Sequence, residues 1–382
     1  MLQITMLQNK IYQNFFKEIL KTFLVILFGL SLIAITVKAV NFLDLIVENG
    51  YSIKTYFTYT LLNFFGVITR FVPLSFLLAL FLFIVKQIKD NEFIILWTSG
   101  VKKLKVVNLF FISSLFIVCL YILMSSLITP LSLNKSRLLL TKDGFNSFLP
   151  TIKVKQFSDS FKGFTFIVDK RFKNQIENVF IYDQSDILQN LTTEDQATNS
   201  TTIISSKGIV EEKKMILFDG YILTEKKDFE NNLVKFEQLN ISLKNLKNNI
   251  IEQPKLQETS TFILMKCFLS TENIEFLDCK KDSKTEIITT LNRRFSLPFY
   301  IPIVSLICSF LLIKTSVKKN YFLNKYSIFF LSFLVLLYSE LVIRFTGLSQ
   351  LISLIFIFTP VIIGPLLYLM LMFKFRKESL IK

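Results

Sequence analysis

The stretch KQIKDNEFIILWTSGVKKL, residues 86–104, separates two of the most apolar runs in the chain and contains its only tryptophan. The apolar runs on either side, at about 57–85 and 105–130, are each long enough to cross roughly 30 Å of hydrocarbon as a helix. The stretch is therefore predicted to connect two membrane-spanning helices.

Apolar side chains make up 52% of the 382 residues, which is typical of a protein with several membrane spans. Six runs are long and apolar enough to span: 22–43, 57–85, 105–130, 295–314, 326–345 and 351–373. Residues 131–294 contain no spanning candidate. The predicted fold class is membrane α-helical, with an N-terminal half (1–130), an inserted extracytoplasmic all-β domain (131–290) and a C-terminal half (291–382).

Lys and Arg residues predict the orientation. Of the 20 outside residues 131–294, four are Lys38, Lys54, Arg70 and Arg344, and the other 16 lie at one set of helix ends. By the positive-inside rule both termini are then cytoplasmic, and the inserted domain lies outside. Residues 131–294 hold 24 basic and 22 acidic side chains, so nearly all of the net charge of +15 belongs to the membrane part. We interpret it as a topology signal and predict no nucleic-acid partner.

Between residues 150 and 245 the hydrophobic period changes from helical to alternating, with short β-rich runs separated by polar turns. Asp219-Gly220 is typical of a tight hairpin. Seven or more strands predict a sandwich or jelly roll, serving either as a purely structural domain or as a sheet with an open face or edge. Cys267 and Cys279 both lie on the predicted outer side, where a disulfide between them is one option.

Several kinds of chemistry have no residues to support them. The chain contains no histidine, which removes histidine-based nucleophile pairs, general bases and metal sites. It contains no G-x-x-x-x-G-K-[ST] sequence and no glycine cluster that would hold a phosphate. We therefore predict no enzyme activity, no cofactor and no metal.

Residues 90–100 have the signals of a short capped helix. Asp90 or Asn91 suits the N-cap, and Glu92 lies in the first turn, where a negative charge is favourable. Gly100 occupies the position of a left-handed C-terminal cap.

Phe93, Leu96 and Trp97 share one face of this helix at i, i+3 and i+4, which predicts a large exposed apolar face. Two interpretations are open. The helix lies on lipid headgroups with Trp97 as an anchor, or it docks in the groove of a cytoplasmic partner.

The sequence resembles the LptF/LptG family of lipopolysaccharide-export permeases, the membrane subunits of an ABC transporter. Residues 91–101, NEFIILWTSGV, are similar to the family pattern S/N-E-L-x-x-L/M-R-A-x-G. Glu92, Leu96 and Gly100 fit, whereas Phe93, Trp97 and Thr98 depart from the usual Leu, Arg and Ala. Residues 292–298, NRRFSLP, are similar to H-R-R-L-x-x-P, with Asn in place of His. FLDLIVENG, residues 42–50, resembles LptF more than LptG.

The resemblance implies an LptG-like partner permease, an LptC-like periplasmic partner and an LptB-like ATPase dimer in the bacterial inner membrane. Lipopolysaccharide is then the substrate, in a cavity lined by the first and fifth helices of both permeases. The coupling helix at about 90–100 would meet the ATPase, through the residues Asn91, Glu92, Phe93, Leu96, Trp97 and Gly100.

Five basic residues are candidates for contacting the phosphates of lipid A: Lys38, Arg70, Arg293, Arg294 and Arg344. Each has an alternative. Lys38 is within reach of Asp44 and Glu48. Arg70 snorkels or binds LptG, and Arg293 and Arg294 sit in an interface. Arg344 pairs with Glu340 at i, i+4.

Three other functions compete with this one. The nearest is the LptG subunit of the same complex. A membrane sensor with a ligand-binding outer domain is another, although the short cytoplasmic loops would require a second chain for output. A secondary transporter is disfavoured because the two halves show no repeat.

Overall fold

The computed structural model describes residues 10–47, 51–143, 154–161, 163–172, 174–184, 198–210, 214–226, 231–242, 254–269, 281–313 and 320–380. The chain divides into two compact units. The first, which we call the bundle unit, comprises Met1–Thr36, Leu62–Asn134 and Gln253–Lys382. The second, the inserted unit, comprises Val37–Leu61 and Lys135–Glu252.

Among the described residues, six helices are long and apolar enough to cross a membrane, which confirms the six predicted spans. The first three are formed by α2 (Lys10–Asn41), α4 (Ile53–Lys89), and α6 (Lys103–Leu123) with the π-helical turn η1 (Met124–Ile128) and α7 (Thr129–Asp143). The fourth runs through α10 (Lys281–Phe295), η5 (Leu297–Phe299), α11 (Tyr300–Ser309) and η6 (Phe310–Leu312). The last two are α12 (Asn320–Val342) with η7 (Ile343–Phe345), and α13 (Gln350–Leu380). The helices extend past the predicted spans because their polar ends remain helical.

The centre of the bundle unit is α11. All of its residues are buried, and it packs against α6, α12 and α13. The other helices divide by burial: 67%, 50% and 78% of the apolar window is buried in the second, third and fourth spans, against 22%, 22% and 17% in the first, fifth and sixth. The first, fifth and sixth helices are therefore peripheral, and their apolar faces are not covered by other parts of the chain that the structure describes.

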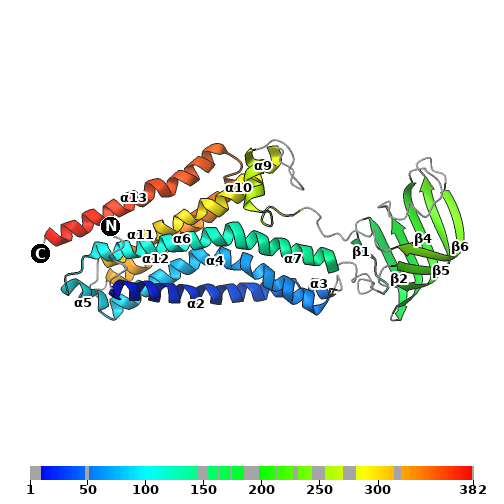
Figure 1. Cartoon of the computed structure of the whole chain (residues 1–382), viewed down its shortest axis with the longest axis horizontal. Coiled ribbons are helices and arrows are strands. Elements are labelled where there is room, and N and C mark those ends of the chain that lie inside the picture. The colour runs from blue at the N-terminus through cyan, green and yellow to red at the C-terminus, as the bar shows by residue number, and fades with distance from the viewer. Residues whose placement is uncertain are drawn as a thin grey trace. The chain divides into compact units, whose positions relative to one another are not determined.

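The two ends of the bundle carry different short elements (Figure 1). The short helix α5 (Glu92–Thr98) lies at the end where α2 begins and α13 finishes. At the opposite end, α9 (Thr261–Leu269) packs on α10. Cys267 on α9 is disulfide-bonded, and Cys279 lies outside the described residues.

The inserted unit contains six strands in one antiparallel sheet (Figure 1). They are β1 (Ser158–Phe161), β2 (Phe164–Phe172), β3 (Gln175–Asp183), β4 (Thr198–Val210), β5 (Lys214–Lys226) and β6 (Asn231–Ser242). Each strand pairs with the next along the chain, so the order in space is the order in sequence. The predicted inserted β domain is confirmed. Within the described residues its topology is a meander, without the crossovers of a jelly roll.

The hairpin predicted at Asp219-Gly220 is wrong, because β5 runs straight through both residues and pairs with β4 on one side and β6 on the other. Asp219 has a φ of 50°, and Ser206 Oγ donates to its carbonyl oxygen at 3.0 Å. A Cβ at Gly220 would overlap the Ile204 carbonyl oxygen and the Phe236 ring. The dipeptide therefore permits close packing between neighbouring strands rather than a turn.

Candidate functional site

The short helix α5 has the predicted position and one of its two predicted N-cap residues, but the cap lacks the expected side-chain hydrogen bond. Asn91 is the N-cap residue with a φ of 58°, and its side chain makes no capping hydrogen bond. At the other end Gly100 has a φ of 85°. The Val101 N–H donates to the Leu96 carbonyl at 3.1 Å and the Gly100 N–H to the Trp97 carbonyl at 3.2 Å. This is a Schellman motif, for which a left-handed glycine is favoured.

The apolar face of α5 is packed inside the chain, contrary to the predicted exposed face. Phe93 is 0% and Leu96 7% exposed, and Trp97 is half-buried. The Phe93 ring packs edge-on against Phe15 of α2 at 6.2 Å and stacks on Trp97 at 5.7 Å. Helical spacing correctly indicated a shared face, but this chain supplies its own groove for that face.

Contacts from this face reach four of the spanning helices. Phe15 of α2 packs against Phe83 of α4 at 5.4 Å, and Phe83 against Phe110 of α6 at 6.1 Å. The ammonium of Lys103 lies 5.8 Å from the Trp97 ring and 5.7 Å from the Phe375 ring of α13. A displacement of α5 would therefore act on α2, α4, α6 and α13 together.

The opposite face of α5 is open. Glu92, Thr98 and Ser99 are exposed, and so are Ile94 and Ile95, which are 41% and 64% exposed. Two neighbouring exposed isoleucines therefore lie close in sequence to an exposed carboxylate on this helix. Ile94 and Ile95 were not predicted as exposed candidates, because helical spacing assigned the apolar face to Phe93, Leu96 and Trp97.

At the other end of the bundle unit, three of the five candidate basic residues gather at one cavity. The cavity has a volume of about 800 Å³, and Lys255, Arg293 and Arg344 line it together with Gln257. Arg70 adjoins it, because its guanidinium donates to the Gln257 side-chain oxygen at 3.1 Å. We call this the basic cavity.

Within the basic cavity the arginines differ in their partners. Arg293 forms a salt bridge with Glu340 of α12 at 3.5 Å. The predicted alternative of a Glu340–Arg344 pair is therefore wrong, since the carboxylate turns toward α10. Arg344 is exposed and has no salt-bridge partner among the described residues.

Gly347 explains how the α12–α13 connection, which carries Arg344, comes so close to α10. A Cβ at this position would overlap the carbonyl oxygen of Thr285 on α10. Without a side chain, Gly347 lets the connection lie directly on the α10 backbone, so that Arg344 and Arg293 line the same cavity.

Residues 14–374 match the family described as Lipopolysaccharide export system permease LptF/LptG. The match covers nearly the whole chain, including both membrane halves and the inserted sheet. The chain belongs to this family. It is thus a membrane component of a lipopolysaccharide export system rather than an enzyme. No curated protein matched the sequence.

Arg294 has a structural position in this permease, in contrast to its predicted place on a substrate-binding rim. It is 4% exposed, and its guanidinium donates to Thr261 Oγ1 at 2.7 Å and to the carbonyl oxygens of Thr259, Leu256 and Gln257 at 2.9, 3.2 and 3.4 Å. A buried charge requires such partners. Arg294 therefore holds the returning segment 256–261 against α10.

The fifth candidate, Lys38, belongs to the inserted unit and does not line the basic cavity. It is half-buried in the last turn of α2 and has an interaction partner within the chain. Sequence reasoning also missed Lys255 and Gln257 of the cavity. Neither belongs to an apolar span, where an unexpected polar residue would have attracted notice.

Proposed function

We propose that this permease is the LptF-type subunit of an ABC transporter that extracts lipopolysaccharide from the bacterial inner membrane. In this proposal it pairs with an LptG-like permease, an LptB-like ATPase dimer and an LptC-like periplasmic protein. The observation that carries the proposal is the family match over residues 14–374. The resemblance of residues 42–50 to LptF supports the choice of subunit.

The exposed face of α5 is the proposed ATPase contact. Glu92 and the adjoining Ile94 and Ile95 offer one charge and apolar area on a helix whose other face is locked into the bundle. Because α5 contacts α2 through Phe93 and α13 through Trp97 and Lys103, movement of a bound ATPase would be transmitted to the peripheral helices.

The peripheral helices are the proposed walls of the lipopolysaccharide cavity. α2 and α12 leave large apolar faces uncovered in this chain, as required of helices that meet a second permease around a lipid. The basic cavity, with Arg70, Arg293 and Arg344, supplies positive charge at one end, where lipid A phosphates would be attracted.

The proposed orientation places α5 in the cytoplasm and the sheet in the periplasm. It is tested by labelling two single-cysteine variants, Lys235→Cys on β6 and Lys102→Cys after α5, because both positions are exposed. A membrane-impermeant maleimide is expected to label position 235 in intact spheroplasts and position 102 only after permeabilisation. The cysteine-free chain is the blank. Labelling in the reverse order would overturn the orientation.

The function is tested by affinity purification of the tagged chain from its own membranes. We expect an ATPase subunit and a second permease of the same family to copurify, and the reconstituted complex to release lipopolysaccharide on adding ATP. Glu92→Lys is expected to release the ATPase while keeping the second permease, since it reverses the charge at the proposed contact. The control is Thr98→Lys, which adds one positive charge to α5 but keeps the carboxylate of Glu92. It separates the loss of the carboxylate from the gain of a positive charge. If no ATPase copurifies with the wild-type chain, the proposal fails.

A further inference from the structure

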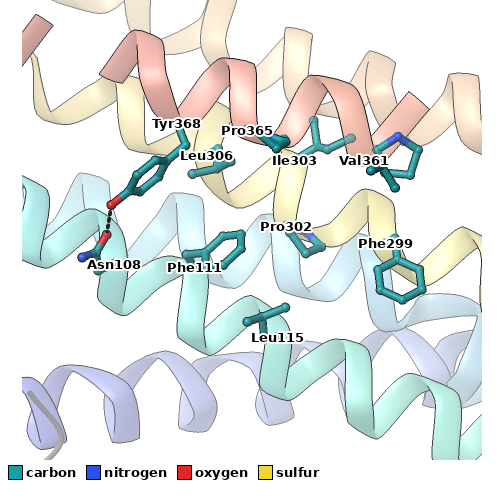
Figure 2. Close-up of a pocket in the computed structure, with 12 residues that line it drawn as sticks. Asn108, Phe111, Leu115, Phe299, Pro302, Ile303, Leu306, Val361, Pro365 and Tyr368 are labelled. Carbon is teal, nitrogen blue, oxygen red and sulfur yellow. Dashed lines mark hydrogen bonds between the residues drawn. The ribbon is translucent and has the colours of Figure 1, made fainter. Parts of the chain in front are cut away.

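A second cavity lies within the span-forming part of the bundle unit, between α6, α11 and α13. Its volume is about 500 Å³. Figure 2 shows side chains of the three helices converging on it, with Pro302, Ile303 and Leu306 on α11 facing Phe111 and Leu115 on α6. Apart from Asn108 and Tyr368 at one end, the side chains that line it are apolar. We call it the three-helix pocket.

The pocket has a closed floor and an open side. Ile303 and Leu306 are 2% and 0% exposed, whereas Leu115 and Val361 on its edges are 42% and 61% exposed. It therefore opens sideways, toward the surroundings of the spanning helices. An opening of this kind in a membrane span faces lipid chains rather than water.

Prolines and a glycine of α13 create the space. Pro360 has no N–H for the carbonyl oxygen of Phe356 one turn earlier, and the Tyr300 hydroxyl on α11 donates to that oxygen at 3.0 Å instead. Gly364 adds no side chain, and a Cβ there would meet nothing within 4 Å. The three-helix pocket therefore results from the proline and glycine residues of α13.

The polar end of the pocket lies on the side of a group of cations. At this end Tyr368 Oη donates to Asn108 Oδ1 at 2.9 Å (Figure 2). Phe310 follows Leu306 by one turn, and the Lys374 ammonium lies 5.6 Å from its ring. Lys374 and Lys105 are both exposed. Positive charge therefore lies just beyond the polar end of an apolar slot.

We propose that the three-helix pocket binds one acyl chain of an anionic glycerophospholipid, with the lipid phosphate against Lys374. An apolar slot that ends near exposed lysines complements such a lipid, and basic sites between membrane helices are typical binding sites for anionic headgroups. This lipid is distinct from the exported substrate: the pocket lies on α6, α11 and α13, away from the α2 and α12 faces proposed for lipopolysaccharide.

A helix of a partner protein is a poorer fit. The pocket extends from Asn108 to Leu115 along α6, about 10 Å at 1.5 Å per residue. Its volume then leaves a cross-section of roughly 50 Å², whereas a helix about 10 Å across occupies roughly 80 Å². A helix is therefore too wide for the pocket, whereas an extended hydrocarbon chain is narrow enough to enter it.

The test is native mass spectrometry of the intact complex, delipidated and then titrated with phosphatidylglycerol or, separately, phosphatidylethanolamine. We expect the wild type to retain one phosphatidylglycerol. Gly364→Leu is expected to remove this adduct, because its side chain enters the pocket without a backbone clash. The matched control is Gly29→Leu on α2, where a Cβ also meets nothing within 4 Å. Because the α2 face is a proposed wall of the lipopolysaccharide cavity, this variant is compared in complexes that keep the second permease, and it is expected to keep the phosphatidylglycerol adduct.

A second variant tests the headgroup. Lys374→Gln is expected to weaken phosphatidylglycerol binding about fivefold, the scale of one exposed charge contact, and to leave phosphatidylethanolamine binding nearly unchanged. Equal adducts on wild type and Gly364→Leu would overturn the proposal. Disulfide crosslinking of a Val361→Cys variant to a helix of a partner chain would overturn it as well. Because lipid retention is measured without export, failure here leaves the proposed function standing.

Discussion

The two ends of the bundle unit differ in which side chains are buried, aromatic rings at one end and a charge at the other. At the α5 end the aromatic rings of Phe93 and Trp97 pack into the chain, and the carboxylate of Glu92 stays outside. At the α10 end it is a charge, the guanidinium of Arg294, that is buried and fully engaged, while its neighbour Arg293 lines a cavity. Residue type alone therefore does not separate the groups that hold this permease together from those that are free to meet a partner.

The largest expected effect is on the free energy of unfolding, and it follows from replacing the buried Phe93. Phe93→Ala should lower the free energy of unfolding by about 3 kcal/mol, because it empties a fully buried site between α5 and α2. Ile95→Ala, on the exposed face, should change stability by less than about 0.5 kcal/mol but weaken ATPase retention. Thermal unfolding of each variant in detergent, followed by pull-down, checks both. If Phe93→Ala keeps its stability and loses only the ATPase, Phe93 contacts the ATPase rather than the interior of this chain.

The next effect compares two arginines at the α10 end. Arg294→Met should destabilise the chain by about 2 kcal/mol, because several hydrogen bonds from a charged donor to the segment 256–261 are lost. Arg344→Met should be nearly neutral, since Arg344 is exposed and has no salt-bridge partner among the described residues. Proteolysis near residue 257 provides a local measurement, with faster cleavage expected in Arg294→Met alone. Equal behaviour of the two variants would contradict the structural position of Arg294.

Local features were predictable from the sequence, and features that depend on distant segments were not. The ends of α5 follow from Asn91 and Gly100, and the six spans follow from apolar run length, so both were predicted. Phe93 is buried because of Phe15, which is far away in the sequence, and periodicity identifies a face without identifying what covers it.

The same reasoning applies to the charged and turn residues. The different positions of Arg293 and Arg294 are set by Glu340 on one side and by residues 256–261 on the other, neither of which is adjacent in sequence. At Asp219-Gly220 a local hairpin signal was overridden by pairing with strands on both sides. The basic cavity is likewise assembled from three segments, so only its individual arginines were predictable.

The smallest expected effect concerns how Arg344 contributes to the basic cavity. If this cavity attracts lipid A phosphates, Arg344→Gln should lower the affinity of the purified complex for lipopolysaccharide about fivefold at low salt, the scale of one exposed charge contact. The loss should shrink as ionic strength rises, because salt screens the contribution of the wild-type arginine. Lys266→Gln on α9 is the matched control, since Lys266 is exposed but does not line the cavity. Microscale thermophoresis with labelled lipopolysaccharide at two salt concentrations measures both variants. Equal affinity in the two variants at low salt would show that the charge of Arg344 does not act on the substrate, and would leave Arg70 and Arg293 to account for any binding there.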